Sequence, residues 1–151
     1  VENNGCPWSD RDGDGVLDKD DNCPDVAGTS SNAGCPEYLL EALEELSVKF
    51  ISDSFDIDPA FEAQLAEAFR IIESNSTAKI IIEGHADATG NDQINVPLSE
   101  LRASQILDYL VRAGIDPDRL SIVGYGSSQP KGDNSTAEGR SQNRRVDFSV
   151  E

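Results

Sequence analysis

Basic residues, cysteine and histidine are scarce in this sequence, and methionine is absent. The 151 residues include 12 Lys and Arg against 29 Asp and Glu, a formal net charge of −17 (12 − 29). Because proteins hold a phosphate backbone with clusters of Lys and Arg, this charge argues against a nucleic-acid partner. No apolar run approaches the roughly 18 residues of a membrane span, and residues 1–6 do not read as a signal peptide. The sequence predicts a soluble acidic protein, or a piece of one.

The composition changes near residue 36. Residues 1–36 hold eight acidic and two basic side chains, all three cysteines and few large apolar residues, so they cannot bury a core alone. Gly-Cys-Pro occurs at 5–7 and again at 34–36, which is typical of a repeated unit, and we expect the sequence to begin at the tail of a preceding unit. Residues 37–151 have the length and apolar content of one packed domain.

The second region predicts an α/β fold. Helical spacing of apolar residues predicts helices over 37–46, 59–72 and 97–113, with a helical turn over 136–141. Apolar or alternating runs predict strands over 48–51, 78–83, 120–125 and 145–150. The expected architecture is a β-α-β-α-β-β sandwich with helices packed on one face of a mixed sheet, preceded by a small calcium-stabilised loop segment.

Five aspartates with a regular spacing lie between residues 10 and 21. Counted from Asp10, carboxylates fall at positions one, three, five, nine and twelve, and a glycine falls at position six. Carboxylates spaced in this way can point their oxygens at one centre, and the glycine allows the sharp turn that a calcium loop needs. The predicted calcium ligands are Asp10, Asp12, Asp14, the Val16 carbonyl, Asp18 and Asp21. We expect calcium to order residues 8–26; the alternative is a solvated acidic linker.

Two of the three cysteines are suited to a disulfide. Cys23 and Cys35 would close a short polar loop, which stabilises a segment that lacks a core. Cys6 is then unpaired, and we expect its partner upstream of residue 1. Three free thiols remain an alternative, whereas a zinc site is disfavoured because the ligand spacing is absent.

Two polar segments of the second region do not fit the role of ordinary loops. The first runs from residue 84 to residue 103, and the second from 139 to 146, where three of the eight arginines lie. Asp87 follows the predicted strand 78–83, and ligands of open α/β sheets collect at the carboxyl ends of strands. The two segments are therefore the candidate binding site.

Both segments resemble the OmpA-like peptidoglycan-binding family, over about residues 46–150. The matching motifs are Gly-His-x-Asp-x-x-Gly at 84–90, Asn95, Leu-Ser at 98–99, Arg-Ala at 102–103, Gly-Tyr-Gly at 124–126 and Gly-Arg-x-x-Asn-Arg-Arg-Val at 139–146. The acidic segment, continued by Asp-Asn-Cys-Pro at 21–24, resembles a thrombospondin type 3 repeat. These resemblances imply a calcium-binding repeat over 1–36 and a peptidoglycan-binding domain over 37–151.

The family resemblance implies a specific ligand, the diaminopimelate of the cell-wall peptide. Its zwitterionic end needs an anion and a cation, and we expect Asp87 to accept from the ammonium and Arg102 to bind the carboxylate with two hydrogen bonds. Further contact positions of the family are matched by Thr89, Asn95, Arg144 and Asp53. The alternative is that Asp87 and Arg102 form only an ion pair with each other.

The expected function is non-catalytic: anchoring the outer membrane to the wall from the periplasmic side, through a region before residue 1, with the calcium repeat as a stiff spacer. The sequence lacks an activated nucleophile and a phosphate loop, and His85, expected to be a hydrogen-bonded structural residue, has no evident Ser or Cys partner. The alternatives are a calcium-dependent adhesion module, in which Trp8 would be the available aromatic, and a wall-active hydrolase, because carboxylates are plentiful.

Overall fold

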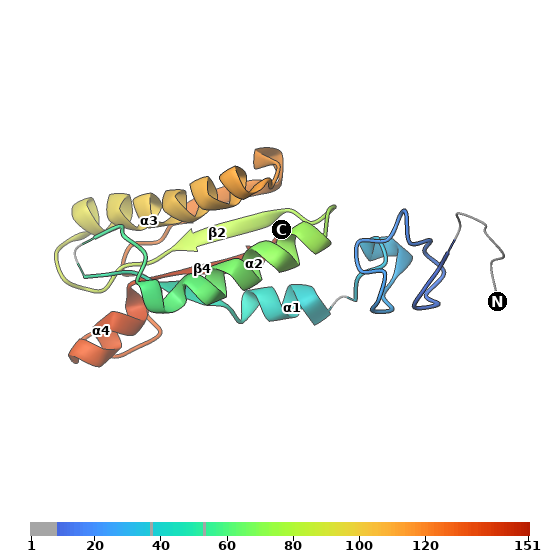
Figure 1. Ribbon diagram of the computed structural model, residues 1–151. Helices are drawn as coiled ribbons and strands as arrows, with labels where there is room; N and C mark the ends of the chain where they lie inside the picture. Colours follow the sequence, from blue (N-terminus) through green and yellow to red (C-terminus); the bar gives the residue numbers. More distant parts are fainter. Residues whose placement is uncertain (1–8, 37, 53) are drawn as a thin grey trace.

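The computed structural model describes residues 9–36, 38–52 and 54–151. Residues 9–36, which we call the N-terminal segment, are mostly loops and lie beyond one end of an α/β domain (Figure 1). The domain alternates helices with strands. Its elements are α1 (Tyr38–Glu44), β1 (Ser47–Lys49), α2 (Glu62–Ser74), β2 (Ile80–Gly84), α3 (Asp92–Ala113), β3 (Leu120–Gly124), α4 (Ala137–Asn143) and β4 (Arg145–Val150).

The four strands of the described residues form one mixed sheet in the order β1-β4-β2-β3. β4 pairs antiparallel with both β1 and β2, whereas β2 and β3 run parallel. Parallel neighbours need a long crossover connection, which α3 supplies. The predicted α/β architecture with a mixed sheet is confirmed.

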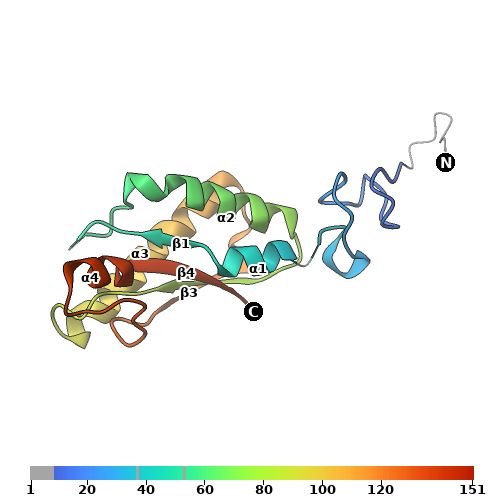
Figure 2. The ribbon, with the colours of Figure 1, turned by 90° about the horizontal axis from the view of Figure 1, so that it is seen from below.

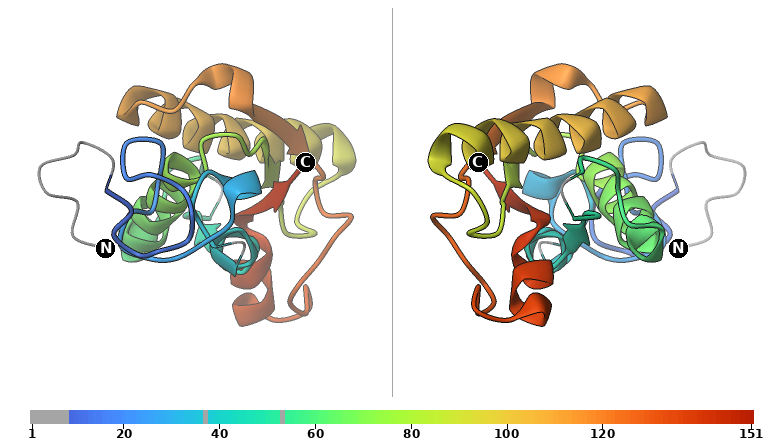
Figure 3. Two further views of the ribbon diagram at one scale, coloured as in Figure 1. Left: turned by 90° about the vertical axis from the view of Figure 1, so that its right-hand side faces the viewer. Right: turned by 90° about the vertical axis from the view of Figure 1, so that its left-hand side faces the viewer.

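Helices α2 and α3 cover one face of this sheet (Figures 2 and 3). Alternate strand residues, among them Ile80, Ile82 and Phe148, point into the core against them and are at most 2% exposed. Their chain neighbours Glu83 and Asp147, which lie opposite each other in the register of β2 and β4, are on the other face. The period of two in the strands therefore separates an apolar core from a polar face.

Helix α3 begins at Asp92, upstream of the start predicted at Pro97. The true N-cap is Asn91, whose side chain accepts a hydrogen bond from the Ile94 N–H at 3.2 Å. Pro97 lies inside the helix, where its missing N–H removes one intrahelical hydrogen bond without ending the helix. The additional turn carries Asn95, which is 3% exposed, toward the domain interior.

Strand β1 is shorter than predicted. It ends at Lys49; Phe50 still donates its N–H to the Arg144 carbonyl at 3.0 Å, and it also forms an isolated bridge with Ile57. Among the described residues, no helix has both the length and the apolar character needed to span a membrane.

The N-terminal segment is attached to the C-terminal end of α2. The predicted disulfide between Cys23 and Cys35 is present, with its Cα atoms 5.0 Å apart. Near it, the buried Asn32 donates from Nδ2 to Asn75 Oδ1 at 2.7 Å, and Asn22 donates to Ser76 Oγ at 2.6 Å. Cys6 and Trp8 lie outside the described residues. The disulfide loop thus rests on the end of a domain helix.

Candidate functional site

The carboxyl end of β2 lies directly against helix α3 because of a glycine. A Cβ atom on Gly84 would overlap the carbonyl oxygen of Ser99 in α3, so a larger residue cannot occupy this position without moving the helix. Ser99 then receives a hydrogen bond at Oγ from the Gly126 N–H at 2.9 Å, which fixes the end of β3 as well. Both motif glycines therefore serve the close approach that forms the site.

A small cavity of about 40 Å³ lies where β2, α3 and α4 end or begin. Five of the six predicted ligand-binding residues line it, while Asp53 lies outside the described residues. The lining consists of Ala86, Asp87, Thr89, Ile94, Asn95, Leu98, Arg102 and Arg144. Two larger hollows, of about 450 and 430 Å³, do not combine an acid with a base in their linings, whereas a third, of about 370 Å³, has Asp25 and Arg70 in its lining.

Asp87 forms an ion pair with Arg144 within this cavity. The distance from Arg144 Nη1 to Asp87 Oδ2 is 2.9 Å, and the two side chains are only 15% and 12% exposed. Burial by itself raises the pKa of Asp87, but hydrogen bonds from the Thr89 backbone and from Arg144 outweigh it, and the pKa lies below its usual value. Asp87 is therefore an anion that already has a cation beside it.

Arg102 is 1% exposed, so it is among the most deeply buried side chains of the domain. Its Nε donates to the Ser54 carbonyl at 3.0 Å and its Nη1 to the His85 carbonyl at 3.2 Å. The guanidinium also lies over the Phe50 ring, 5.6 Å from its centre. These contacts fix the guanidinium of Arg102 at the cavity. Among the described residues, Asp87 forms its ion pair with Arg144 and not with Arg102, which was the alternative considered from the sequence.

Two buried donors of the lining have no hydrogen-bond partner among the described residues. They are Nδ2 of Asn95 and Nε of Arg144. Buried donors are nearly always paired, so these two are available for an acceptor group of a ligand. Together with the Asp87 carboxylate, they suit a small molecule that carries an ammonium and a carboxylate.

His85 precedes the residues that line the cavity and is 1% exposed, as expected of a structural residue. The prediction that it is hydrogen-bonded is wrong, because neither ring nitrogen has a hydrogen-bond partner among the described residues. Its Nε2 lies 3.7 Å from the Asp147 carboxylate, and its ring stacks on Tyr125 with 5.3 Å between the ring centres. Burial, and then the charge of Arg145, lower its pKa to about 4. His85 is therefore neutral at pH 7.

Sequence reasoning missed two residues at this site. Ile94 lines the cavity although it is 59% exposed. An apolar residue that does not belong to the buried face of its helix could have indicated a contact with a ligand. Asn134 accepts a hydrogen bond from the Ala88 N–H at 3.1 Å. Nothing in the local sequence indicates this contact, because 46 residues separate the partners.

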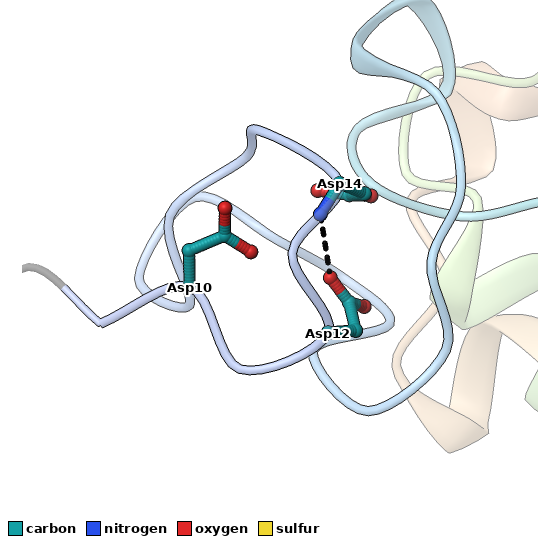
Figure 4. A group of neighbouring side chains, drawn as sticks. All are labelled: Asp10, Asp12 and Asp14. Atoms are coloured by element: carbon teal, nitrogen blue, oxygen red, sulfur yellow. Dashed lines mark hydrogen bonds between the residues drawn. The ribbon is translucent and has the colours of Figure 1, made fainter. Parts of the chain in front are cut away.

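The predicted calcium loop brings three aspartates together. Oxygens of Asp10, Asp12 and Asp14 lie within 4.8 Å of one another, and Figure 4 shows their side chains around a common space. Gly13 and Gly15 adopt φ angles of 79° and 91°. These left-handed conformations suit glycine and turn the loop so that the carboxylates converge.

A fourth predicted ligand, Asp21, belongs to the same group electrostatically. Oδ2 of Asp12 and Oδ2 of Asp21 are both buried without a hydrogen-bond partner among the described residues. The pKa of Asp12 is raised, first by burial and then by the charges of Asp14, Asp21 and Asp10. Buried oxygens with mutual repulsion fit a hard divalent cation.

Asp18, predicted as a further ligand, is placed differently. It accepts hydrogen bonds from Ser9 Oγ and from the Arg11 N–H, the latter at 2.8 Å, and these contacts lower its pKa. It is not among the three converging aspartates. The predicted contribution of the Val16 carbonyl stays a prediction.

Comparison with known proteins gives consistent matches. The model of the OmpA family matches residues 49–144. Outer membrane porin F of Pseudomonas aeruginosa is 39% identical over 146 residues, which cover 95% of this chain and 42% of that protein. Peptidoglycan-binding protein ArfA of Mycobacterium tuberculosis is 38% identical over 125 residues, which cover 82% of this chain and 38% of that protein. The chain thus spans about two fifths of each relative.

Solved structures share the fold of the domain. The peptidoglycan-associated lipoprotein from Burkholderia pseudomallei has a TM-score of 0.66 and 25% identity, covering 70% of this chain and 90% of that one. The C-terminal domain of Helicobacter pylori MotB has a TM-score of 0.64 and 25% identity, with 70% and 83% coverage.

Proposed function

The chain belongs to the OmpA family, and from this membership and the charged cavity we propose that it binds peptidoglycan non-covalently and anchors the outer membrane to the wall. The similar proteins support this, since they include a peptidoglycan-binding protein, a peptidoglycan-associated lipoprotein and outer membrane porins. The domain then works on the periplasmic side of the outer membrane. The observation that carries the proposal is one cavity lined by Asp87, Arg102 and Arg144.

The ligand in this proposal is the diaminopimelate of the wall peptide. Asp87 in this cavity is already paired with Arg144 at 2.9 Å, so in this proposal the ligand's ammonium takes the place of Arg144 at Asp87 and opens that ion pair. An ammonium that replaces Arg144 at Asp87 frees a guanidinium, which then needs a carboxylate. A zwitterion supplies both charges at once and leaves no buried ion unpaired, whereas a simple amine leaves Arg144 without a partner.

A hydrolytic role finds no support in the cavity. Glycoside hydrolysis uses two carboxylates that flank the scissile bond. Among the described residues, the lining holds one carboxylate, Asp87, and Arg144 neutralises it. A binding module is therefore the function that the arrangement favours.

For the N-terminal segment, the proposal is a calcium-bound spacer. Asp10, Asp12 and Asp14 would hold the ion, with Asp21 beside them, because their oxygens converge and two of them lack donors. A bound dication would remove the repulsion that raises the pKa of Asp12. The disulfide loop would transmit this rigidity to α2. For the adhesion alternative, the described residues of the segment offer one exposed large apolar side chain, Val26.

The test compares wall of the diaminopimelate type with wall of the lysine type. The wild type should sediment with the first and bind free diaminopimelate in calorimetry, and Arg102→Gln should lose both. The matched control is Arg112→Gln, which removes an exposed guanidinium from the same helix. Equal retention by both walls would remove the proposed ligand, and equal binding by the two variants would remove the proposed site.

A further inference from the structure

The loop over residues 131–136 packs tightly on helix α4. Gly132 and Gly139 face each other across this contact: a Cβ on Gly132 would press on the backbone of Gly139, and a Cβ on Gly139 would overlap the carbonyl oxygen of Asp133. The two glycines therefore allow the loop backbone to lie directly on the helix backbone. Such an approach leaves the loop little room to move.

A buried amide holds the same loop in place. Asn143, at the end of α4, is 0% exposed. Its Oδ1 accepts from the N–H groups of Lys131 and Gly132 at 2.7 and 2.8 Å, and its Nδ2 donates to Gly132 O at 3.0 Å and to Asn134 Oδ1 at 2.7 Å. Every hydrogen-bonding position of this amide is used, so the side chain defines where Asn134 lies.

Asn134 connects this fixed loop to the residues that line the cavity. Its Oδ1, besides accepting from Asn143, accepts from the N–H of Ala88 at 3.1 Å. Ala88 stands between Asp87 and Thr89, which both line the cavity. The backbone carbonyl of Asn134 also accepts a hydrogen bond, from Nη1 of Arg140 at 3.0 Å. One side-chain oxygen thus connects α4 to the backbone that presents Asp87.

The same end of α4 also leads to the counter-ion of Asp87. Arg144 follows Asn143 directly in the chain and pairs with Asp87. Asp87 and Arg144 are therefore both positioned by the buried Asn143, Arg144 as its neighbour in the chain and Asp87 through Asn134. A zwitterion can be held at both ends only if the spacing of anion and cation is fixed, and misplacement by about 1 Å weakens such a site strongly.

We propose that Asn134 is a positioning residue of the ligand site, which fixes residues 87–89 relative to Arg144 through its Oδ1. The role rests on the proposed function of the cavity. Asn134 itself does not line the cavity. Only its oxygen is used by the contacts to Ala88 and Asn143, so an aspartate at this position keeps both acceptor roles and an alanine keeps neither.

The experiment uses the full chain with three substitutions. Asn134→Ala removes the oxygen, and Asn134→Asp retains it. Ser135→Ala is the matched control, because the Ser135 hydroxyl donates only within its own turn, to Asp133. For each protein, calorimetry gives the affinity for meso-diaminopimelate, and NMR gives the hydrogen exchange of the Ala88 amide and the titration of the Asp87 carboxyl.

We expect Asn134→Ala to lower the affinity about three- to tenfold, as the loss of one positioning hydrogen bond predicts. The Ala88 amide should exchange faster, and the pKa of Asp87 should rise toward its ordinary value. Asn134→Asp and Ser135→Ala should resemble the wild type in affinity and in Ala88 exchange. Recovery by the aspartate would separate positioning from a general loss of packing.

Several results would overturn the role. Unchanged affinity in Asn134→Ala, or an equal loss in Asn134→Asp and Asn134→Ala, would contradict positioning through the oxygen. A wild type that binds no diaminopimelate would overturn the proposed function instead. In that case the ligand-free readouts still decide the geometry: unchanged Ala88 exchange and an unchanged Asp87 titration in Asn134→Ala would refute the contact.

Discussion

Asp12 in the N-terminal segment and Asp87 in the domain are both partly withdrawn from water, yet their pKa values move in opposite directions. Burial raises the pKa of Asp12, and neighbouring aspartates raise it further. Burial also opposes ionisation of Asp87, but Thr89 and Arg144 donate to it, and its pKa falls. The neighbouring charges that shift the pKa of Asp12 are all anions, whereas Asp87 has a cation, Arg144, beside it. In the proposed functions, Asp12 would therefore gain a metal ion, and Asp87 would exchange one cation for another.

The two regions also obtain their order differently. The domain has a core of buried aliphatic and aromatic residues between its sheet and helices. In the segment, order comes from turns, from carboxylates that accept backbone N–H groups, and from the disulfide. The predictions below use this difference, beginning with the largest effect.

Glycine substitutions should separate the two regions most strongly. Gly84→Ala should destabilise the domain by about 3 kcal/mol, because the added Cβ overlaps α3 and forces it to move. Gly15→Ala meets no atom within 4 Å, so its strain is that of a positive φ, about 1 kcal/mol, and should appear as weaker calcium binding. Urea unfolding and calcium calorimetry measure the two effects. Equal effects on domain stability would break the comparison.

Removal of one charge from each region should give a reciprocal result. Asp87→Asn should weaken diaminopimelate binding about a hundredfold, because a charged hydrogen bond to the ammonium is lost, and should leave calcium affinity unchanged. Asp12→Asn should weaken calcium binding and leave the ligand affinity unchanged. Calorimetry of each variant with each ligand checks this. Loss of ligand binding in both variants would mean that the regions do not act independently.

We expect a fall in pH to lower the stability of the domain through its single histidine, His85. The folded pKa of His85 is about 4, below its unfolded value of 6.5, so the unfolded chain takes up the proton first. Stability should therefore fall by about 1 to 2 kcal/mol as the pH drops from 7 to 5, and this contribution should be exhausted below pH 4. In His85→Gln the slope between pH 6.5 and 4 should flatten. Thermal unfolding over this range, with and without calcium, would detect it; an unchanged slope contradicts the assignment.

The exchange of partners at Asp87 should reverse the ligand preference of one variant. In Arg144→Gln, 1,5-diaminopentane should bind more tightly than to the wild type, since it no longer competes with a guanidinium. Diaminopimelate should bind about tenfold more weakly, because its carboxylate loses a charged donor. Calorimetry with both compounds tests the reversal. A parallel change for the two ligands would show that Arg144 does not exchange partners.

Much of the fold was predictable because it depends on local periodicity. The β-branched run that contains Ile80 and Ile82 forms a central strand as expected. The start of α3 was wrong because Pro97 is a strong signal for the first turn, while the actual cap, Asn91, lies further upstream. The helix continues through Pro97 because Asn91 caps its N-terminus and the proline removes only one intrahelical hydrogen bond.

The composition of the site was more predictable than its connections. Asp87, Thr89, Asn95, Arg102 and Arg144 were identified from the motifs, and they line one cavity. The pairing of Asp87 with Arg144 could not be predicted, because it depends on how α4 and β4 return to β2 across 57 residues. For the same reason, the two carbonyls that hold Arg102 were not foreseen. Sequence patterns select residue types, and tertiary packing decides their partners.

The N-terminal segment lies beyond the end of the domain opposite to the arrowhead of β2 (Figure 1). It contacts residues 75 and 76, between α2 and the start of β2, whereas the residues that line the cavity follow the end of β2. A pull between the N-terminal segment and a ligand bound in the cavity would therefore run along the strands, not across them. The hydrogen bonds that join β4 to β2 lie perpendicular to the strands, so they would be sheared together and not broken one after another. Under the proposed function, the sheet would resist such a force along its stiffest direction.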